Sequence, residues 1–422
     1  MVLNGLTPRK RKSMTITRTD EYSAVAGDFF RQEQPALYNT IVSGGRQSDR
    51  SAVEMSMIEL ARTAAKQNRQ QMPVVIIHCG NPHLKQRYCR EGKNIRLPEV
   101  GYTQFEPLEG LTDQEIAGRL YAAASQNSNV LGAGFRDAVI KGCELLHLQG
   151  EKPGILTLSA LPWGRLPVYV EQLLKQGRVE REEAMLLLAE LGELSAELRQ
   201  AAAFLQQLRE EYEPLAVQGA PAAGLDTVIR KNGIACIELA SGMTAMRELV
   251  FYTLKRLTLQ RKRFLLVADA FPIPQDKSYV RDVLCSGSED YSVVMAYADM
   301  PAALRDSFNS FAGGNTNVIL FAHQSGASAE IWADYIGKRY QLVENTSASD
   351  SRSKTDFLSG QVTRSRNREE QLRHVIPAEE TQHLGRGEAL VQAGDSGSGV
   401  WFVDFPKMEQ LVQSKTLRLP GW

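Results

Sequence analysis

The sequence predicts an α/β protein in which a mostly parallel sheet is covered by helices and interrupted by an all-helical insertion. Three observations lead to this fold class. Short apolar runs alternate with longer amphipathic stretches along most of the chain, as strands alternate with helices in such proteins. Several of the runs are continuously apolar, which is typical of strands buried on both faces. The stretch 162–212, by contrast, contains no strand signal.

Six segments have the length and composition of buried strands. In chain order they are LYNTIVSG ending near Gly44, PVVIIHC from Pro73, GIACIEL from Gly233, RFLLVAD from Arg263, YSVVMAY from Tyr291 and NVILFA from Asn317. Near the C-terminus, EALVQAG and GVWFVDF predict a closing β-pair around the turn-forming sequence DSGSG. The segment GDSGSG is similar to the serine segment of trypsin-like proteases, but an α/β chain lacks the β-barrel and partners of that chemistry, so we interpret it as a turn.

The helical stretch from Pro162 to Tyr212 carries an apolar seam. Its members recur at alternating spacings of four and three and are Leu187, Leu191, Leu194, Leu198, Ala201, Leu205 and Leu208. Because three heptads are few for an intermolecular coiled coil, an inserted antiparallel helical subdomain is favoured over a dimerisation zipper. Pro214 ends the stretch, and residues 220–224 form a hinge back to the sheet.

Composition describes an ordinary globular chain. Its 422 residues suggest two or three domains, and 43% of them are hydrophobic. With 49 basic and 49 acidic side chains, the formal net charge is zero, so a nucleic acid or an anionic membrane would have to bind a local patch. Five dispersed cysteines and no membrane-spanning run predict a cytoplasmic protein without an integral membrane segment. We interpret the basic cluster Arg9–Lys12 as part of a solvated tail.

The first strand is followed by GGRQSDRS and then by a helical pattern. Strand, glycine-containing loop and helix is the context in which a GxxxxGK[ST] loop binds phosphate with its amides. Overlaying that pattern places Asp49 at the second glycine, Arg50 at the lysine and Ser51 at the hydroxyl position, so two of four defining positions differ. The candidate residues of this degenerate phosphate loop are Gly44, Gly45, Ser48, Asp49, Arg50 and Ser51.

The two changes act against phosphate binding. A carboxylate at Asp49 would satisfy the free N–H groups at the helix start, which a phosphate would otherwise use. At about 4 Å from a phosphate and an effective dielectric near 20, each pair of unit charges repels by roughly 4 kcal/mol, or about a thousandfold in affinity. Arg50 keeps a positive charge but as a planar fork, and it is free to pair with Asp49 or with another nearby acid.

Asp269 ends the apolar run RFLLVAD, where a P-loop ATPase carries its Mg-associated carboxylate. The next residue is Ala270, where such an enzyme often has a catalytic Glu. If Mg is bound, Ser51 and Asp269 are the candidate ligands. The alternative is that Asp269 simply ends a strand.

The order of these segments resembles the cytoplasmic ATPase of conjugation and type IV secretion coupling proteins of the TraG/TraD type, within the FtsK/HerA group of P-loop motors. The resemblance rests on the degenerate loop, RFLLVADAF, YSVVMAYADMPAAL, FAGGNTNVILFAHQSGASAEIWADYIGKRY and LRHVIPAEETQHLGRGEALVQAG, and covers residues 38–405. It implies a RecA-like P-loop NTPase sheet flanked by helices. We expect a basic tail at 1–37, the first part of the sheet domain at 38–161, the all-α subdomain at 162–222 and the second part at 223–422.

The chain departs from that family at several functional positions. Tyr297 stands where the family has its sensor Gln, and HCGN at His78–Asn81 stands where it has Asp-Pro-Lys-Gly. The usual N-terminal membrane helices are also absent from the sequence. Because loop, catalytic Glu and sensor are lost together, we expect a pseudo-ATPase without a required cofactor, with ATP and Mg bound only if the nucleotide site is functional.

Two other groups of residues are candidates for a functional site. His78, Cys79, His83 and Cys89 match no zinc module in their spacing, so an exposed loop is favoured over a metal site. The polar segment between Asn345 and Gln371 predicts a long loop, and its cations either stay solvated or contact DNA phosphates; they are Arg352, Lys354, Arg364, Arg366 and Arg368.

The sequence therefore supports three hypotheses. The first is a non-hydrolysing, coupling-protein-like component of a bacterial conjugation or type IV secretion system that recruits a protein or nucleoprotein substrate, or supports an active paralogue, as a homo- or hetero-oligomer. It would lie in the cytoplasm, at the inner face of the membrane when partners hold it there. The second is an active ATP-dependent DNA or protein translocation motor with an atypical loop. The third is a DNA-binding module that needs no nucleotide.

Overall fold

The computed structural model of this chain describes most of the residues between positions 16 and 404. The described ranges are 16–19, 39–127, 131–217, 221–271, 283, 291–300, 316–350, 362–374, 376–385, 387–392 and 400–404. The basic cluster Arg9–Lys12, the DSGSG turn and the cations Arg352 and Lys354 lie outside them. In the part of the chain that is described, no helix is long and apolar enough to cross a membrane.

A 12-stranded sheet forms the centre of the described structure, in the order β1-β14-β13-β10-β2-β9-β8-β3-β7-β4-β5-β6. Its middle, from β10 to β7, is entirely parallel. The strands are β1 (Ile16–Thr19), β2 (Asn39–Ser43), β3 (Val74–His78), β4 (Ile95–Leu97), β5 (Gly101–Phe105), β6 (Ala222–Ala223), β7 (Ile234–Glu238), β8 (Phe264–Asp269), β9 (Tyr291–Tyr297), β10 (Thr316–Leu320), β13 (Glu388–Gln392) and β14 (Val400–Asp404). All six predicted inner strands are thus confirmed, as is the closing antiparallel pair β13–β14.

Helices cover both faces of the sheet, which confirms the predicted fold class. Alternate residues of one strand enter different cores, because successive side chains of a strand point to opposite faces. In β3, Val74 and Ile76 pack in the core that contains α3 (Gln47–Gln67) and α4 (Pro82–Tyr88). Val75 and Ile77 pack in the core that contains α12 (Thr244–Leu259). The continuously apolar strands are therefore explained by burial on both sides.

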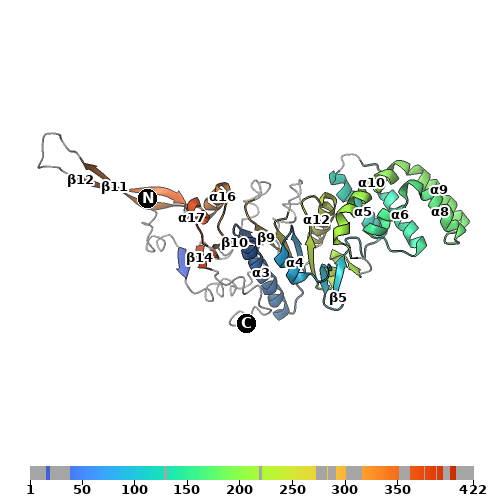
Figure 1. Cartoon of the computed structure of the whole chain (residues 1–422), viewed down its shortest axis with the longest axis horizontal. Helices are drawn as coiled ribbons and strands as arrows, with labels where there is room; N and C mark the ends of the chain where they lie inside the picture. Colours follow the sequence, from blue (N-terminus) through green and yellow to red (C-terminus); the bar gives the residue numbers. More distant parts are fainter. Residues whose placement is uncertain are drawn as a thin grey trace.

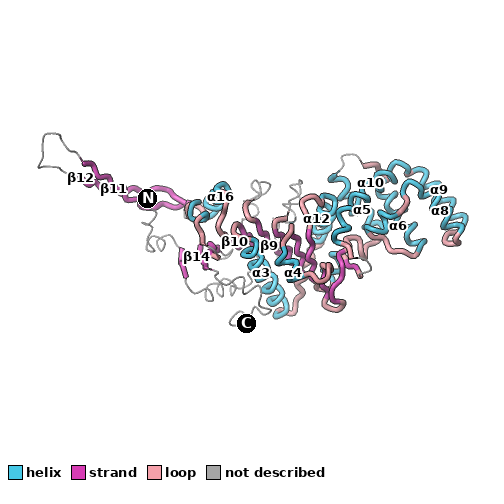
Figure 2. The backbone as a smooth tube through the Cα atoms, viewed as in Figure 1, coloured by secondary structure: helices cyan, strands magenta, loops and turns pink. Residues whose placement is uncertain are grey.

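A helical region lies at one end of the molecule (Figures 1 and 2). Its elements are α5 (Asp113–Asn127), α6 (Phe135–Gln149), α7 (Ile155–Ala160), the 3-10 turn η2 (Trp163–Arg165), α8 (Leu166–Lys175), α9 (Arg181–Glu193), α10 (Ser195–Tyr212) and the 3-10 turn η3 (Glu213–Leu215). Because α5, α6 and α7 precede position 162, the helices begin well before the expected insertion 162–222. The short helix α11 (Leu225–Arg230) then leads back to β7.

The apolar seam of this region is divided between two helices. Leu194 lies between the end of α9 and the start of α10. Helix α9 therefore carries Leu187 and Leu191, while α10 carries the seam residues from Leu198 onward. The seam residues of both helices are buried inside the chain, except Leu194, which is partly buried. This intramolecular burial agrees with the antiparallel subdomain and leaves no seam for a zipper.

Polar contacts join the helical region to the sheet domain. The Tyr212 hydroxyl donates to the carbonyl of Phe105 at 2.7 Å. The Glu211 carboxylate accepts from the backbone amides of Ala245 and Met246, at 3.1 and 2.7 Å, in the first turn of α12. A carboxylate at a helix N-terminus is favourable for the helix dipole. These contacts fix α10 against β5 and α12.

At the opposite end of the molecule a two-stranded ribbon projects from the sheet (Figure 1). It consists of β11 (Lys338–Asp350) and β12 (Val362–His374), paired antiparallel from Lys338↔His374 to Asp350↔Val362. The prediction of a loop from Asn345 to Gln371 is therefore wrong for its two flanks, which are strands. Their polar sequence gives no strand signal, because a ribbon that covers no core needs no alternation of apolar and polar residues. Helices α16 (Gly326–Ile336) and α17 (Ala378–Gln382) flank its base.

The N-terminal segment 1–37 is not all tail. Its described part, Ile16–Thr19, forms β1 and pairs in parallel with β14. A short strand at the start of the chain therefore extends the edge formed by β13 and β14, which corrects the expectation of a solvated tail at these four positions.

Candidate functional site

The candidate site lies at the carboxyl ends of the parallel strands. There β9 separates the loop-bearing strand β2 from β8, which ends in Asp269. The register pairs Ser43 with Tyr297 and Asp269 with Ala296, so these ends lie level. In open α/β sheets, this edge is where ligands bind. The fold therefore brings the loop, Asp269 and Tyr297 together as the sequence predicts.

Two glycines shape the turn out of β2. Gly44 and Gly45 have φ values of 81° and 67°, the left-handed region that glycine adopts without strain. The amide of Gly44 donates to the carbonyl of Tyr297 at 2.9 Å, and that of Gly45 to the carbonyl of Ala322 at 2.7 Å. Both amides are thus used by neighbouring loops, so neither is directed at a ligand.

Asp49 is the third residue of helix α3, which begins at Gln47. Its Oδ2 accepts a hydrogen bond from the backbone amide of Arg46 at 3.2 Å. The Ser48 hydroxyl lies 3.5 Å from Oδ1 of the same carboxylate. A side chain of the chain itself therefore supplies the negative charge at this helix N-terminus, and the prediction for Asp49 is confirmed.

Arg50 turns into the protein instead of toward a ligand. Its side chain is buried, and Nη1 donates to the carbonyls of Gly44 and Gly45 at 3.2 and 2.9 Å. Its Nε lies 3.9 Å from Oδ1 of Asp269. Of the partners that the sequence left open, the structure selects this nearby acid over Asp49. The guanidinium therefore ties the loop to the end of β8.

Asn81 completes this connection, and sequence reasoning assigned it no role. Its Nδ2 donates to Oδ2 of Asp269 at 2.5 Å and to the hydroxyl of Ser51 at 2.8 Å. Its Oδ1 accepts from the amides of His83 and Leu84, which begins α4. Ser51 itself donates to the carbonyl of Gln47 at 2.7 Å. One asparagine therefore joins the loop helix, Asp269 and α4.

A second acid, Glu54, lies one turn further along α3 and was also missed. It is fully buried, and neither of its carboxylate oxygens has a hydrogen-bond partner among the described residues. Burial raises the pKa of Glu54 well above its ordinary value, and the nearby charge of Asp269 raises it further. Burial likewise raises the pKa of Asp269, while Asn81 and Arg50 oppose the shift. The site thus holds two acids around one guanidinium.

Tyr297 occupies the position between the loop and Asp269 where the sequence places a sensor. It is 8% exposed, and its hydroxyl lies 3.4 Å from the carbonyl of Phe271, to which it donates. Its own carbonyl accepts from Gly44. Tyr297 therefore contacts backbone on both sides of the site and holds the two loops in place.

The histidines and cysteines at the end of β3 and after it do not gather around one point within the described residues. No group of three potential metal ligands occurs within the described residues. His78 is 1% exposed and accepts from the amide of Asn81 at its Nδ1, 3.1 Å away, which corrects the expectation of exposed histidines. Burial lowers the pKa of His78 to about 4. The imidazole is therefore a neutral support for Asn81.

In this arrangement the residues do not fit a Mg-nucleotide. Magnesium requires oxygen ligands at about 2.0–2.1 Å in octahedral geometry. Ser51 Oγ and Asp269 Oδ2 both already accept from Asn81. A phosphate would need the loop cation, but Arg50 donates hydrogen bonds to two loop carbonyls and forms an ion pair with Asp269 at 3.9 Å. Asn81 would have to release Ser51 and Asp269 before Mg could bind there, and Arg50 would have to leave the loop carbonyls before it could bind a phosphate.

A strand, a loop and a helix, with a strand that ends in Asp two positions along the sheet, form the arrangement that the resemblance to P-loop NTPases implies. No family model and no curated protein matches the chain. Solved structures of the bacterial conjugative coupling protein TrwB do resemble it. The complex with the GTP analogue GDPNP is 14% identical, covers 94% of this chain and 92% of that chain, and has a TM-score of 0.49.

Two further TrwB structures give similar values. The unbound monoclinic form is 13% identical, covers 89% of this chain and 86% of that chain, and has a TM-score of 0.47. The complex with ADP and Mg2+ is 13% identical, covers 94% and 92%, and has a TM-score of 0.45. At identities of 13–14%, these are likenesses of fold alone.

Proposed function

We propose that this chain is a coupling-protein-like component of a bacterial conjugation or type IV secretion apparatus that does not hydrolyse nucleotide. One observation carries the proposal: the loop cation, the strand-end carboxylate and the loop hydroxyl are connected to one another, in part through Asn81. Arg50 links the loop carbonyls to Asp269, and Asn81 links Asp269 to Ser51. The groups that a P-loop enzyme uses for phosphate and Mg serve here to hold the fold.

The energetic balance supports this proposal. To bind phosphate, Arg50 must leave two carbonyls and Asp269, and Asp49 must release the amide of Arg46. A hydrogen bond that involves a charged group contributes about 1.5–3 kcal/mol, so the release of several of them offsets most of what nucleotide binding gains. Ala270 follows Asp269, so the chain has no carboxylate next to it to activate water.

A chain that does not hydrolyse nucleotide can still recruit another component of the apparatus. The helical region offers the candidate surface for such binding. Its two outer helices expose three large apolar side chains, Val168, Met185 and Leu186, by 51%, 64% and 61%. Exposed apolar side chains of this size are common where proteins meet other proteins. We propose that a protein or nucleoprotein substrate, or an active paralogue, binds through this region.

Calorimetric titration with Mg-ATP tests the loss of nucleotide binding. The unchanged chain is compared with an Asp49→Gly, Arg50→Lys double variant and with a triple variant that adds Asn81→Gly. The added substitution removes the side chain that occupies Ser51 and Asp269. Arg199→Lys, at an exposed position on α10, is the matched control. We expect the unchanged chain and the control to show no Mg-ATP binding that Arg50→Ala abolishes at about 1 mM nucleotide, a free energy near −4 kcal/mol.

The outcomes separate the hypotheses. Binding by the double or triple variant alone means that these side chains close a cradle that still exists, which supports the proposal. No binding by any form means that the phosphate site is lost in further residues, which also supports it. Micromolar binding by the unchanged chain, with phosphate release that Arg50→Ala abolishes, overturns it in favour of an active motor.

A further inference from the structure

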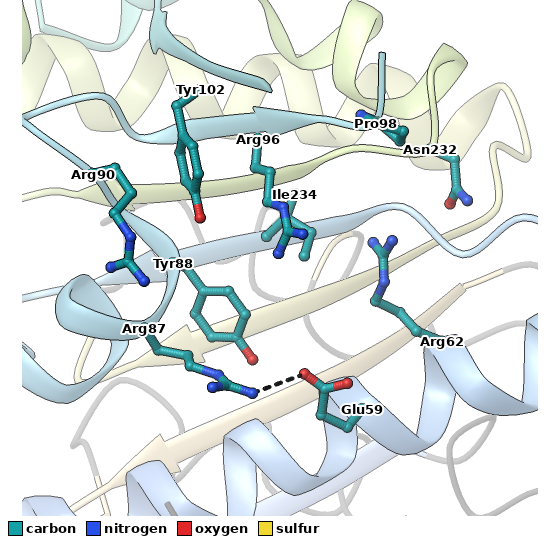
Figure 3. Close-up of a pocket in the computed structure, with 10 residues that line it drawn as sticks. All are labelled: Glu59, Arg62, Arg87, Tyr88, Arg90, Arg96, Pro98, Tyr102, Asn232 and Ile234. Carbon is teal, nitrogen blue, oxygen red and sulfur yellow. Dashed lines mark ion pairs between the residues drawn. The ribbon is translucent and has the colours of Figure 1, made fainter. Parts of the chain in front are cut away.

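A cavity lies far from the loop, on the face of the sheet that α3 and α4 cover. It opens between the second half of α3, the end of α4 and the strands β4 and β5, and its volume is about 530 Å³ (Figure 3). Glu59 and Arg62 stand 12 and 15 residues after Gln47, the first residue of α3, so the cavity is about 20 Å from the loop along the helix. We call it the arginine cavity.

The arginine cavity is strongly basic in a chain of zero net charge. Four arginines line it, from α3, α4, β4 and the segment that follows α4, against the single carboxylate Glu59 of the lining, which leaves three positive charges. They are Arg62, Arg87, Arg90 and Arg96. Only Arg87 pairs with Glu59, at 3.6 Å. Because guanidinium groups this close repel one another, the fold keeps them together against an electrostatic cost.

Arg62 shows that cost most directly. Burial lowers its pKa; Glu59 opposes the shift, while the neighbouring Arg96 adds to it. Its Nη1 is buried and has no hydrogen-bond partner among the described residues, and the same holds for the hydroxyl of Tyr88. Figure 3 shows both side chains directed into the cavity. A buried charged donor without an acceptor is rare, and a bound anion is what would satisfy it.

Two further cations of the cavity, Arg90 and Arg96, lie beside an aromatic ring. The guanidinium carbons of Arg90 and Arg96 each lie 6.0 Å from the centre of the Tyr102 ring, a distance at which a cation is attracted to an aromatic face. Arg90 also donates to the carbonyls of Gln86 and Cys89. Both arginines are exposed, and Arg90, which makes the additional backbone contacts, is the more restricted before a ligand arrives, which lowers the entropy that binding would cost.

We propose that the arginine cavity binds a small organic molecule that carries two or more phosphate groups. A phosphate monoester carries about 1.5 to 2 negative charges near neutral pH, so two phosphates are needed to balance the three positive charges. Guanidinium groups recognise phosphate through paired hydrogen bonds. A neighbouring cavity of about 440 Å³ shares Arg62 and continues past Lys66 and Arg69, which gives room for the rest of the ligand.

Calorimetry of the full chain with pyrophosphate, and with ADP in the absence of Mg, tests this site. Arg62→Gln and Arg96→Gln are each expected to weaken binding tenfold or more, since each removes a charge-assisted contact. Glu59→Gln is expected to strengthen binding severalfold, because it removes the competing carboxylate and frees Arg87. Arg199→Gln on α10 should leave binding unchanged. Arg62→Lys retains the charge and checks that any loss does not come from misfolding.

The loop and the arginine cavity are distinguished by Asp49→Asn, which should leave pyrophosphate binding in the cavity unaltered but strengthen any binding at the loop, because it removes the carboxylate that repels phosphate there. Equal affinity in the Arg62→Gln variant and the unchanged chain would overturn the proposal. So would the absence of pyrophosphate and ADP binding at about 1 mM, a free energy near −4 kcal/mol. Arg62-dependent binding of a single-stranded oligonucleotide, without binding of either small ligand, would assign the cavity to nucleic acid and likewise overturn it.

Discussion

Replacing Arg50 by alanine should loosen the centre of the sheet. If Arg50 were a ligand-binding residue turned toward solvent, its loss would leave the folded protein nearly unaffected. Here the change removes the cation beside two buried acids, Asp269 and Glu54. At 3.9 Å and an effective dielectric near 20, the attraction between Arg50 and Asp269 is about 4 kcal/mol. Removing one partner of a buried pair costs about 3–5 kcal/mol, so we expect a loss of that size.

Hydrogen exchange measured by mass spectrometry reports this loss locally, which matters because a chain of 422 residues need not unfold in one step. A loss of 3–5 kcal/mol corresponds to exchange about a hundredfold to several thousandfold faster in α3 and β8 at neutral pH. The effect should shrink in acid, because Asp269 without Arg50 is protonated more readily. Arg199→Ala, on the surface of α10, should change exchange by less than about twofold, or roughly 0.5 kcal/mol.

Adding Asp269→Asn to Arg50→Ala completes the experiment. Without the carboxylate, the missing guanidinium leaves no uncompensated charge at this position, so the double variant should lose less than the sum of the single variants, by about 0.5–3 kcal/mol. Unchanged exchange of α3 and β8 in Arg50→Ala would refute the reasoning, because it would mean that Arg50 does not support the fold.

Two further predictions concern stability. Burial raises the pKa of Glu106 to about 7, so this acid favours folding fully below its unfolded pKa near 4.5, and the contribution falls by about 3 kcal/mol as pH rises to 7. The difference in melting temperature between the unchanged protein and Glu106→Gln should therefore move in favour of the variant as pH rises from 4.5 to 8, and a difference that does not change with pH would assign the slope to another group. Gly45→Ala should cost about 1–3 kcal/mol, because its φ is 67° and the new Cβ would lie 2.6 Å from Cβ of Phe321. Gly118→Ala, in the middle of α5 with open space around it, should instead stabilise by about 0.5–1 kcal/mol, and equal melting temperatures of the two variants would contradict both expectations.

The inner strands could be predicted from the sequence because they are apolar on both faces. The edge strands β4, β5 and β6 could not, because they are short and, in β4 and β5, partly exposed. Helices α5 and α6 fit equally well as crossover helices of the sheet, so the start of the helical region at Asp113 was not visible. Their assignment depends on packing against α10 and α12, which no local pattern encodes.

The site was predicted in outline but not in its connections. Asn81 is 188 residues from Asp269 and 30 from Ser51, so only the sheet brings the three together. One signal was available: Asn81 follows the end of β3, and the carboxyl ends of parallel strands meet at one edge. Glu54 gave no such signal, because an acid within a helical pattern is normally exposed.

The position of β2 between β9 and β10 has a consequence for how the protein is made. Residues 39–43 pair with residues that lie some 250 or more positions later in the chain. At a synthesis rate of 5–20 residues per second, β2 waits roughly 10–50 s for its partners. The helical region has local contacts and folds on its own timescale meanwhile. The joining of Arg50, Asn81 and Asp269 is therefore a late step of biogenesis, and the nascent chain carries an unpaired apolar strand until it occurs.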